Sequence, residues 1–110
     1  MRISHWPLPK SKNGFGGFPN RVVINSRLYF TQEEYDRIKT NEIIHVIQQM
    51  ECSDNPNEWT WKGYMRWLVL YIQAHFKYGY DDNPFERDSR DYDTDLKSRP
   101  RYNWKNYNAS

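Results

Sequence analysis

The longest amphipathic pattern in the chain runs from Trp59 to Tyr80, with the sequence WTWKGYMRWLVLYIQAHFKYGY. On an α-helix, which turns by about 100° per residue, most of its apolar side chains fall on one face and its basic side chains on another. Asn57 is positioned to cap the start of this helix, and Gly79 to end it. We expect the helix to be central and to meet the core through Trp61, Tyr64, Met65, Leu68, Ile72, His75, Phe76 and Gly79.

A second apolar stripe lies beside this face, at the spacing i, i+4, i+7 and i+11. It consists of Trp67, Tyr71, Ala74 and Tyr78. Two interpretations stay open. In the first, neighbouring elements pack on both flanks of the helix and bury both stripes. In the second, Trp67, Tyr71 and Tyr78 contact a partner, because Trp and Tyr dominate interface hot spots. Charged residues interrupt the apolar run, which argues against a membrane span.

Residues 21–30, RVVINSRLYF, contain two short β-branched and aromatic runs separated by Asn25 and Ser26. Asn tolerates a positive φ, so this dipeptide suits a two-residue turn. The pattern predicts a β-hairpin, which needs a helix over one face because an isolated hairpin is only marginally stable in water.

A helix start follows at Thr31, where Thr31 and Glu34 fit a capping box. A single helix from there to Met50 would place Glu42 inside the apolar stripe. A break at Thr40 and Asn41 avoids this burial, so we expect two short helices, at about 32–39 and 42–52.

The two ends of the chain look less regular. Residues 1–20 hold three prolines and three glycines and predict an irregular N-terminal arm. Residues 81–110 are polar and poor in aliphatic residues, which predicts an extended C-terminal tail. Aromatic residues recur along this tail and can anchor it, either to its own domain or to another molecule: Phe85, Tyr92, Tyr102, Trp104 and Tyr107. The expected fold class is α+β, with residues 21–80 forming the hairpin and the helical body of one domain.

Composition changes this picture in two ways. The 110 residues are 37% hydrophobic but include five Trp, nine Tyr and five Phe, so the core of this single small domain must be rich in aromatic side chains. Cys52 is the only cysteine, which excludes an internal disulfide and favours a reducing compartment. The first residues lack the apolar run of a secretion signal, so we expect a cytoplasmic protein.

The net charge of +2 conceals blocks of opposite sign. Residues 1–30 carry five basic and no acidic side chains, and residues 96–110 carry four basic ones; residues 31–60 and 81–95 are each acidic by five charges. These blocks either pair with one another in the fold or leave basic patches that suit an acidic partner or nucleic acid.

No motif for a metal, a nucleotide or a nucleophile is present. The three histidines and Cys52 lack the spacing of a metal site. Asp91–Asp95 resembles the start of a calcium loop but has Leu96 and Tyr102 where that loop needs Gly and Glu. The glycines near Phe15 lack the spacing of a phosphate loop, and Cys52 lies beside acidic residues that do not activate a thiol. We therefore expect no cofactor and no catalysis.

Basic side chains alternate with aromatic rings, which are the ingredients of single-strand nucleic-acid binding. The candidate contacts to nucleic acid or to an acidic partner are Arg21, Arg27, Lys62, Arg66, Lys77, Arg99, Arg101 and Lys105. No sequence signature of a nucleic-acid-binding fold accompanies them.

These features favour a small non-catalytic interaction protein. We expect an inhibitor or regulator that docks on and occludes a larger nucleic-acid-handling complex, of the kind that phages and mobile elements use against host defence. The expected partner-binding residues are Trp67, Tyr71, Tyr78, Tyr102, Trp104 and Tyr107. An acidic segment suited to a basic groove comprises Asp88, Asp91, Asp93 and Asp95. A single-stranded nucleic-acid-binding protein and a virion or assembly subunit are the alternatives.

Overall fold

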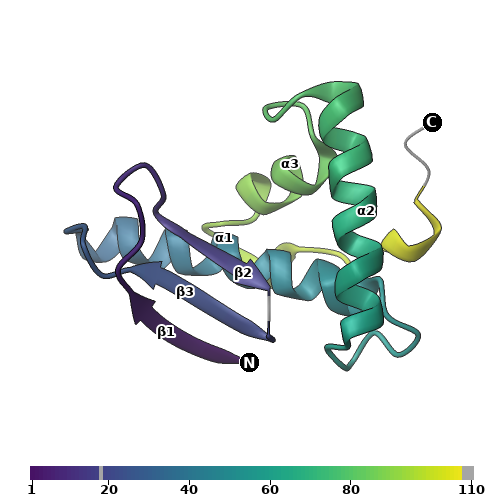
Figure 1. Ribbon diagram of the computed structural model, residues 1–110, viewed down its shortest axis with the longest axis horizontal. Coiled ribbons are helices and arrows are strands. Elements are labelled where there is room, and N and C mark those ends of the chain that lie inside the picture. Colours follow the sequence, from purple (N-terminus) through teal and green to yellow (C-terminus); the bar gives the residue numbers. More distant parts are fainter. Residues whose placement is uncertain (18, 108–110) are drawn as a thin grey trace.

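The computed structural model describes residues 1–17 and 19–107 and confirms the mixed α+β class. Three strands precede three helices and two short 3₁₀ turns (Figure 1). The elements are β1 (Arg2–Trp6), β2 (Gly14–Gly17), β3 (Arg21–Asn25), α1 (Gln32–Glu51), α2 (Trp61–Tyr78), α3 (Pro84–Asp91), η1 (Leu96–Ser98) and η2 (Trp104–Asn106). None of the helices in the described residues is long and apolar enough to cross a membrane.

The sheet has the order β1-β3-β2, with β1 parallel and β2 antiparallel to the central β3. The first strand of the predicted hairpin is therefore correct, but its second strand is wrong: β3 pairs with two strands from the segment that we expected to be an irregular arm. The reason lies in Asn25, whose buried side chain accepts hydrogen bonds from the amides of Leu8 and Arg27 and donates to the carbonyls of Pro9 and Lys12. Asn25 thus holds the β1–β2 connection instead of a hairpin turn.

Helix α1 is continuous over 20 residues, so the prediction of two short helices is wrong. Its start is as expected, because Thr31 and Glu34 form both hydrogen bonds of the capping box. Glu42 does not break the helix although it is partly buried. Burial raises the pKa of Glu42, and the charge of His45 counteracts this by stabilising the carboxylate. A carboxyl that can stay protonated, or face a cation, is tolerated inside the apolar stripe.

The sheet packs along most of α1, from Tyr35 to Met50. Val22 and Ile24 of β3 form one core cluster with Val46 of α1. Strand β2 comes so close that a Cβ on Gly16 would lie 2.1 Å from the carbonyl oxygen of Glu42. Only a glycine allows this backbone-to-backbone approach.

Helix α2 crosses the second half of α1 (Figure 1). The predicted helix and its end at Gly79, with φ of 78°, are confirmed, whereas the cap is Thr60 and not Asn57. Of the predicted core face only Tyr64 and Leu68 pack against the core, and the rest of this prediction is wrong. The buried residues of α2 are Gly63, Trp67 and Ala74, because a small residue at 63 lets α2 approach the carbonyl of Gln49 on α1.

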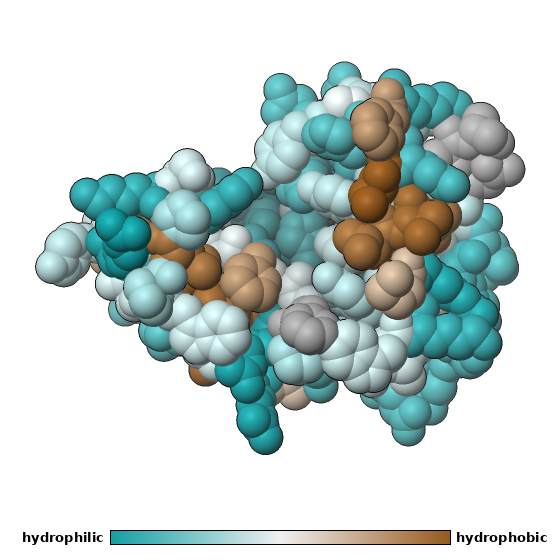
Figure 2. Space-filling view, in the orientation of Figure 1, coloured by the Kyte–Doolittle hydropathy of each residue, from teal (hydrophilic) through white to brown (hydrophobic). Residues whose placement is uncertain are grey.

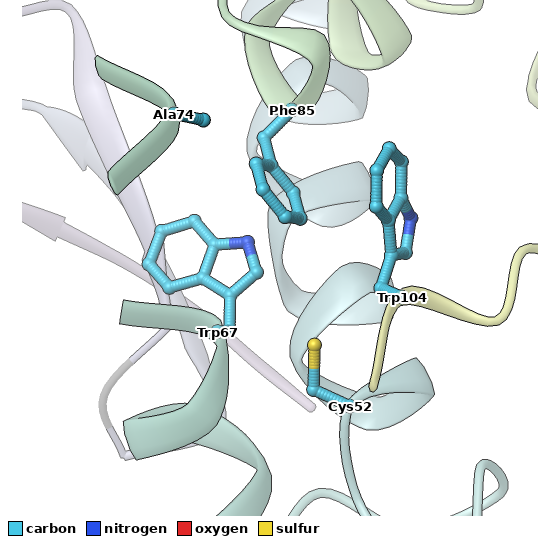
Figure 3. Close-up of a cluster of buried hydrophobic side chains, with 5 residues drawn as sticks. All are labelled: Cys52, Trp67, Ala74, Phe85 and Trp104. Carbon is cyan, nitrogen blue, oxygen red and sulfur yellow. The ribbon is translucent and has the colours of Figure 1, made fainter. Parts of the chain in front are cut away.

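The C-terminal segment folds back on its own domain instead of extending away. Asn83 caps α3, and Phe85 of α3 is fully buried. The ring of Trp104 lies 4.3 Å from that of Phe85, centre to centre. Figure 3 shows these rings converging with Trp67 and the Cys52 sulfur. The described part of the segment, up to residue 107, is thus anchored by its own core.

Candidate functional site

The outward side of α2 presents an exposed row of large apolar side chains, which we call the apolar face of α2. Its members and their exposed fractions are Trp61 53%, Met65 52%, Val69 51%, Ile72 44% and Phe76 84%. Figure 2 shows strongly hydrophobic atoms gathered in this region. A contiguous apolar patch on the surface of a small soluble domain is typical of an interaction site.

The spacing of these residues suits a helical partner. Met65, Val69, Ile72 and Phe76 follow the 4-3-4 spacing of a heptad seam. The face points away from the buried side of α2, since Gly63, Trp67 and Ala74 lie on the opposite side of the helix. Sequence reasoning placed most of these residues in the core and left out Val69, although the heptad spacing could have revealed the seam.

Basic side chains follow one flank of the apolar face. They are Lys62, Arg66 and Lys77, and α2 contains no acidic residue. Lys62 and Arg66 reach the exposed Asp54 at 3.2 and 2.9 Å. Ion pairs this exposed are weak, so this flank stays positive towards an approaching partner.

Most of the predicted partner-binding residues lie in the core or pack against it. Trp67 and Trp104 are each 8% exposed. Tyr71 donates its hydroxyl to Glu86 at 2.6 Å, and Tyr107 packs against Phe85. The expectation that Trp67 and Trp104 are surface contacts is therefore wrong, and for Trp67 the alternative interpretation, burial in the core, is correct.

Two predicted partner-binding residues do reach the surface. Tyr78 is 42% exposed at the end of α2, and Tyr102 is 36% exposed beside Trp104. They lie on different elements, so they form no continuous surface with the other predicted residues.

The predicted basic contacts are also dispersed. Arg99 is unsuited to bind a ligand, because its side chain is 4% exposed and pairs with Glu51 at 2.6 Å and Asp88 at 2.8 Å. Lys77 lies over the ring of Tyr78. Of the remaining four, Arg21 and Arg27 lie at the sheet, and Arg101 is exposed in the C-terminal segment. Lys105 is exposed on η2.

The acidic segment does not form a single surface. Asp88 is buried in the pair with Arg99 and also accepts a hydrogen bond from Gln48. Asp93 pairs with Arg37 at 3.4 Å. Asp91 and Asp95 are exposed, and Asp95 accepts a hydrogen bond from the hydroxyl of Ser98.

A buried polar network joins α1, α2 and α3. The Gln48 side-chain oxygen lies 3.0 Å from His45 Nδ1 and accepts from Trp67 Nε1 at 3.0 Å, while its amide nitrogen donates to Asp88 and to the carbonyl of Phe85. His45 Nε2 lies 3.4 Å from Glu86. Because each of these groups has a partner, the network costs little to bury and fixes the relative positions of the helices.

The charges in this network are fixed near neutral pH. Burial alone lowers the pKa of His45, but the hydrogen bond to Glu86 and the charges of Glu42 and Glu86 outweigh it and raise this pKa to about 9. Burial raises the pKa of Glu86, but His45 and two tyrosine hydroxyls hold it below its ordinary value. His45 and Glu86 thus form an ion pair, and a protonated His45 is not a general base.

Three members of this network, His45, Trp67 and Glu86, line an open pocket of about 850 Å³ between the β1–β2 connection, α1, α2 and α3. Glu42, Tyr71 and Tyr80 also line it.

Within the described residues, no group of three or more His, Cys, Asp and Glu side chains is arranged to hold a metal ion. Burial and the charge of Glu51 raise the pKa of Cys52 to about 12, so its thiol is no nucleophile at neutral pH.

The His45 pair makes stability depend on pH. Because the folded pKa of about 9 exceeds the ordinary 6.5, its contribution is complete below pH 6.5 and is lost as the pH rises through 9. We expect the free energy of unfolding to fall by roughly 3 kcal/mol over this window. Urea titrations at a series of pH values measure it, and in His45→Gln the curve should be nearly flat. A wild-type curve as flat as that of the variant would contradict the pairing.

Searches with protein-family models, among curated proteins and among solved structures find no match to this chain. The function must therefore be argued from the surfaces themselves.

Proposed function

We propose that the protein is a non-catalytic interaction module that docks on a larger protein through the apolar face of α2. The observation that carries this proposal is the row of exposed side chains from Trp61 to Phe76, of which Phe76 is 84% exposed. In this mode the protein acts as an inhibitor or regulator, by covering a surface of its partner.

The partner that fits is an amphipathic helix whose apolar seam is flanked by Asp or Glu. The 4-3-4 spacing of Met65, Val69, Ile72 and Phe76 accepts such a seam. The basic flank of Lys62, Arg66 and Lys77 favours acidic neighbours and repels basic ones. A second copy of the chain fits poorly, because α2 offers no acidic residue and an antiparallel pair would place the basic flank against itself.

The test uses two synthetic amphipathic peptides with the same Leu seam, one flanked by Glu and one by Lys. We expect fluorescence anisotropy to show binding of the Glu-flanked peptide only. Replacing Ile72 and Phe76 by Ser should weaken this binding by at least about tenfold, whereas Tyr29→Ser is the matched control, since Tyr29 is fully exposed and lies far from α2 in the sequence.

Three outcomes would contradict the proposal: equal binding of both peptides, no effect of the α2 substitutions, or a concentration-dependent dimer in sedimentation that the α2 substitutions abolish. The last would assign the face to a second copy. Deleting residues 81–110 is a poor test, because it would remove the core residues Phe85 and Trp104.

A further inference from the structure

The sheet has a second face, which points away from α1 and which we call the outer sheet face. In the pairing register Arg2 lies opposite Arg21, Ser4 opposite Val23, and Phe15 opposite Val23. Paired residues of neighbouring strands point to the same side. Val22 and Ile24 pack against α1, so the alternate residues, together with Trp6 at the end of β1, face outward.

Two aromatic rings lie on this outer sheet face. Trp6 and Phe15 are 40% and 38% exposed, and their rings meet edge to face at 6.2 Å. Val23, which is paired with Phe15, and Asn25, which is paired with Trp6, are both fully buried, so the rings cover this face of β3 and remain partly open to solvent. Ring surfaces that are both rigidly placed and exposed can stack with a flat ligand.

The charged side chains of the three strands and of their connections are all basic, although Phe15 also borders the pocket that Glu34 and Glu42 line. The guanidinium of Arg21 lies 5.1 Å from the centre of the Trp6 ring, and its Nε has no hydrogen-bond acceptor in the described residues. The first thirty residues contain no acidic side chain. The five basic residues of this block are Arg2, Lys10, Lys12, Arg21 and Arg27.

In the described residues these basic side chains form no ion pair with the acidic blocks of the chain. The ion pairs found in residues 1–17 and 19–107 use Arg37, His45, Lys62, Arg66, Arg90 and Arg99. None of the five N-terminal basic residues takes part. The two interpretations of the charge blocks therefore hold in different parts of the chain. Arg99, near the C-terminal end, pairs with acidic side chains, whereas the basic residues of the sheet and its connections form an open basic patch.

We propose that the outer sheet face binds single-stranded nucleic acid, with bases stacking on Trp6 and Phe15 and phosphates held by the N-terminal basic block. Stacking is available to unpaired bases, whereas a duplex keeps its base faces covered. This site shares no residue with the apolar face of α2, because its rings belong to β1 and β2 of the sheet and the apolar face belongs to α2 (Figure 1).

The test is fluorescence anisotropy with labelled oligonucleotides of about 20 nucleotides, as single-stranded DNA, as single-stranded RNA and as duplex DNA. We expect the single strands to bind with a dissociation constant of about 10⁻⁴–10⁻⁶ M. With three to five phosphate contacts, a plot of the logarithm of the affinity against the logarithm of the salt concentration should have a slope of about −2 to −3.5. The DNA and RNA arms establish whether the sugar matters.

Two sets of variants separate stacking from charge. Trp6→Leu with Phe15→Leu keeps Val23 covered but removes the rings, and should weaken single-strand binding by at least about fivefold. Replacing Arg2, Lys10 and Lys12 by Gln should reduce the salt slope by about 2 without touching the core. The α2 substitutions Ile72→Ser and Phe76→Ser are the matched control and should leave the affinity unchanged.

The proposal is overturned if no oligonucleotide binds at low salt, if the Leu variants bind as well as the wild type, or if duplex binds as tightly as single strands. It is also overturned if heparin competes as well as an unlabelled single strand at equal charge, because the site would then recognise charge alone.

Discussion

Replacing Arg99 by Gln should lower the free energy of unfolding by about 3–5 kcal/mol. Arg99 is the cation of a buried triad with Glu51 and Asp88, in which the three side chains are 3–5% exposed. Burial alone lowers the pKa of Arg99, but the hydrogen bonds to the two carboxylates raise it, so the guanidinium stays charged. Without it, two carboxylates would face each other with little access to water. A domain of this size has only about 5–15 kcal/mol of stability.

Urea denaturation followed by circular dichroism measures this loss. Arg101→Gln is the matched control, because Arg101 is exposed, and it should change stability by no more than about 0.5 kcal/mol. Adding Glu51→Gln and Asp88→Asn to the Arg99→Gln variant should recover part of the stability, since the carboxylates are then neutral. Equal stability of the Arg99 and Arg101 variants would show that the triad contributes nothing.

The triad also explains why the sequence predicts an extended C-terminal segment. Its composition is that of a disordered tail, and local propensity predicts no regular structure for it. Arg99 meets Glu51 across 48 positions of the chain, and this long-range ion pair has no local signature. The aromatic residues did predict anchoring, and the partner of Trp104 turns out to be Phe85 of the same segment.

Local chemistry predicted the helix starts and ends better than the pairing of strands. The capping box at Thr31 and the stop at Gly79 depend on neighbouring residues, and both are confirmed. The sheet depends on which strands meet, and a parallel β1–β3 pair joins residues about 19 positions apart. The Asn25 side chain, which appeared to mark a hairpin turn, instead binds a distant loop.

Amphipathic periodicity predicted α2 but not the side that it buries. Two apolar stripes were available, and the larger one lies outward. Gly63, which has no side chain, lets α2 lie against the carbonyl of Gln49, and the small Ala74 is fully buried, so packing follows these small residues and not the sum of hydrophobicity. When a helix has two apolar stripes, the small residues therefore mark the buried one, and the bulky exposed one is the candidate interface.

Replacing Trp67 by Ala should accordingly cost about 3–5 kcal/mol of folding stability, whereas Phe76→Ala should cost no more than about 1 kcal/mol. The indole of Trp67 fills the space between Cys52, Phe85 and Ala74 and donates to Gln48, so its removal leaves a cavity and weakens the polar network. Trp67→Phe keeps most of the ring and should recover part of the loss. Urea denaturation measures all three variants.

Binding should respond in the opposite order. Phe76→Ala should weaken binding of the Glu-flanked helical peptide, because Phe76 is exposed on the apolar face of α2. Trp67→Phe, measured where it remains folded, should bind that peptide like the wild type, because Trp67 faces the core. A stable Trp67→Ala protein that has lost only peptide binding would instead show that Trp67 contacts the partner. Stability and peptide binding, measured on the same variants, thus distinguish the buried stripe of Trp67, which stabilises the domain, from the exposed stripe of Phe76, which binds the partner.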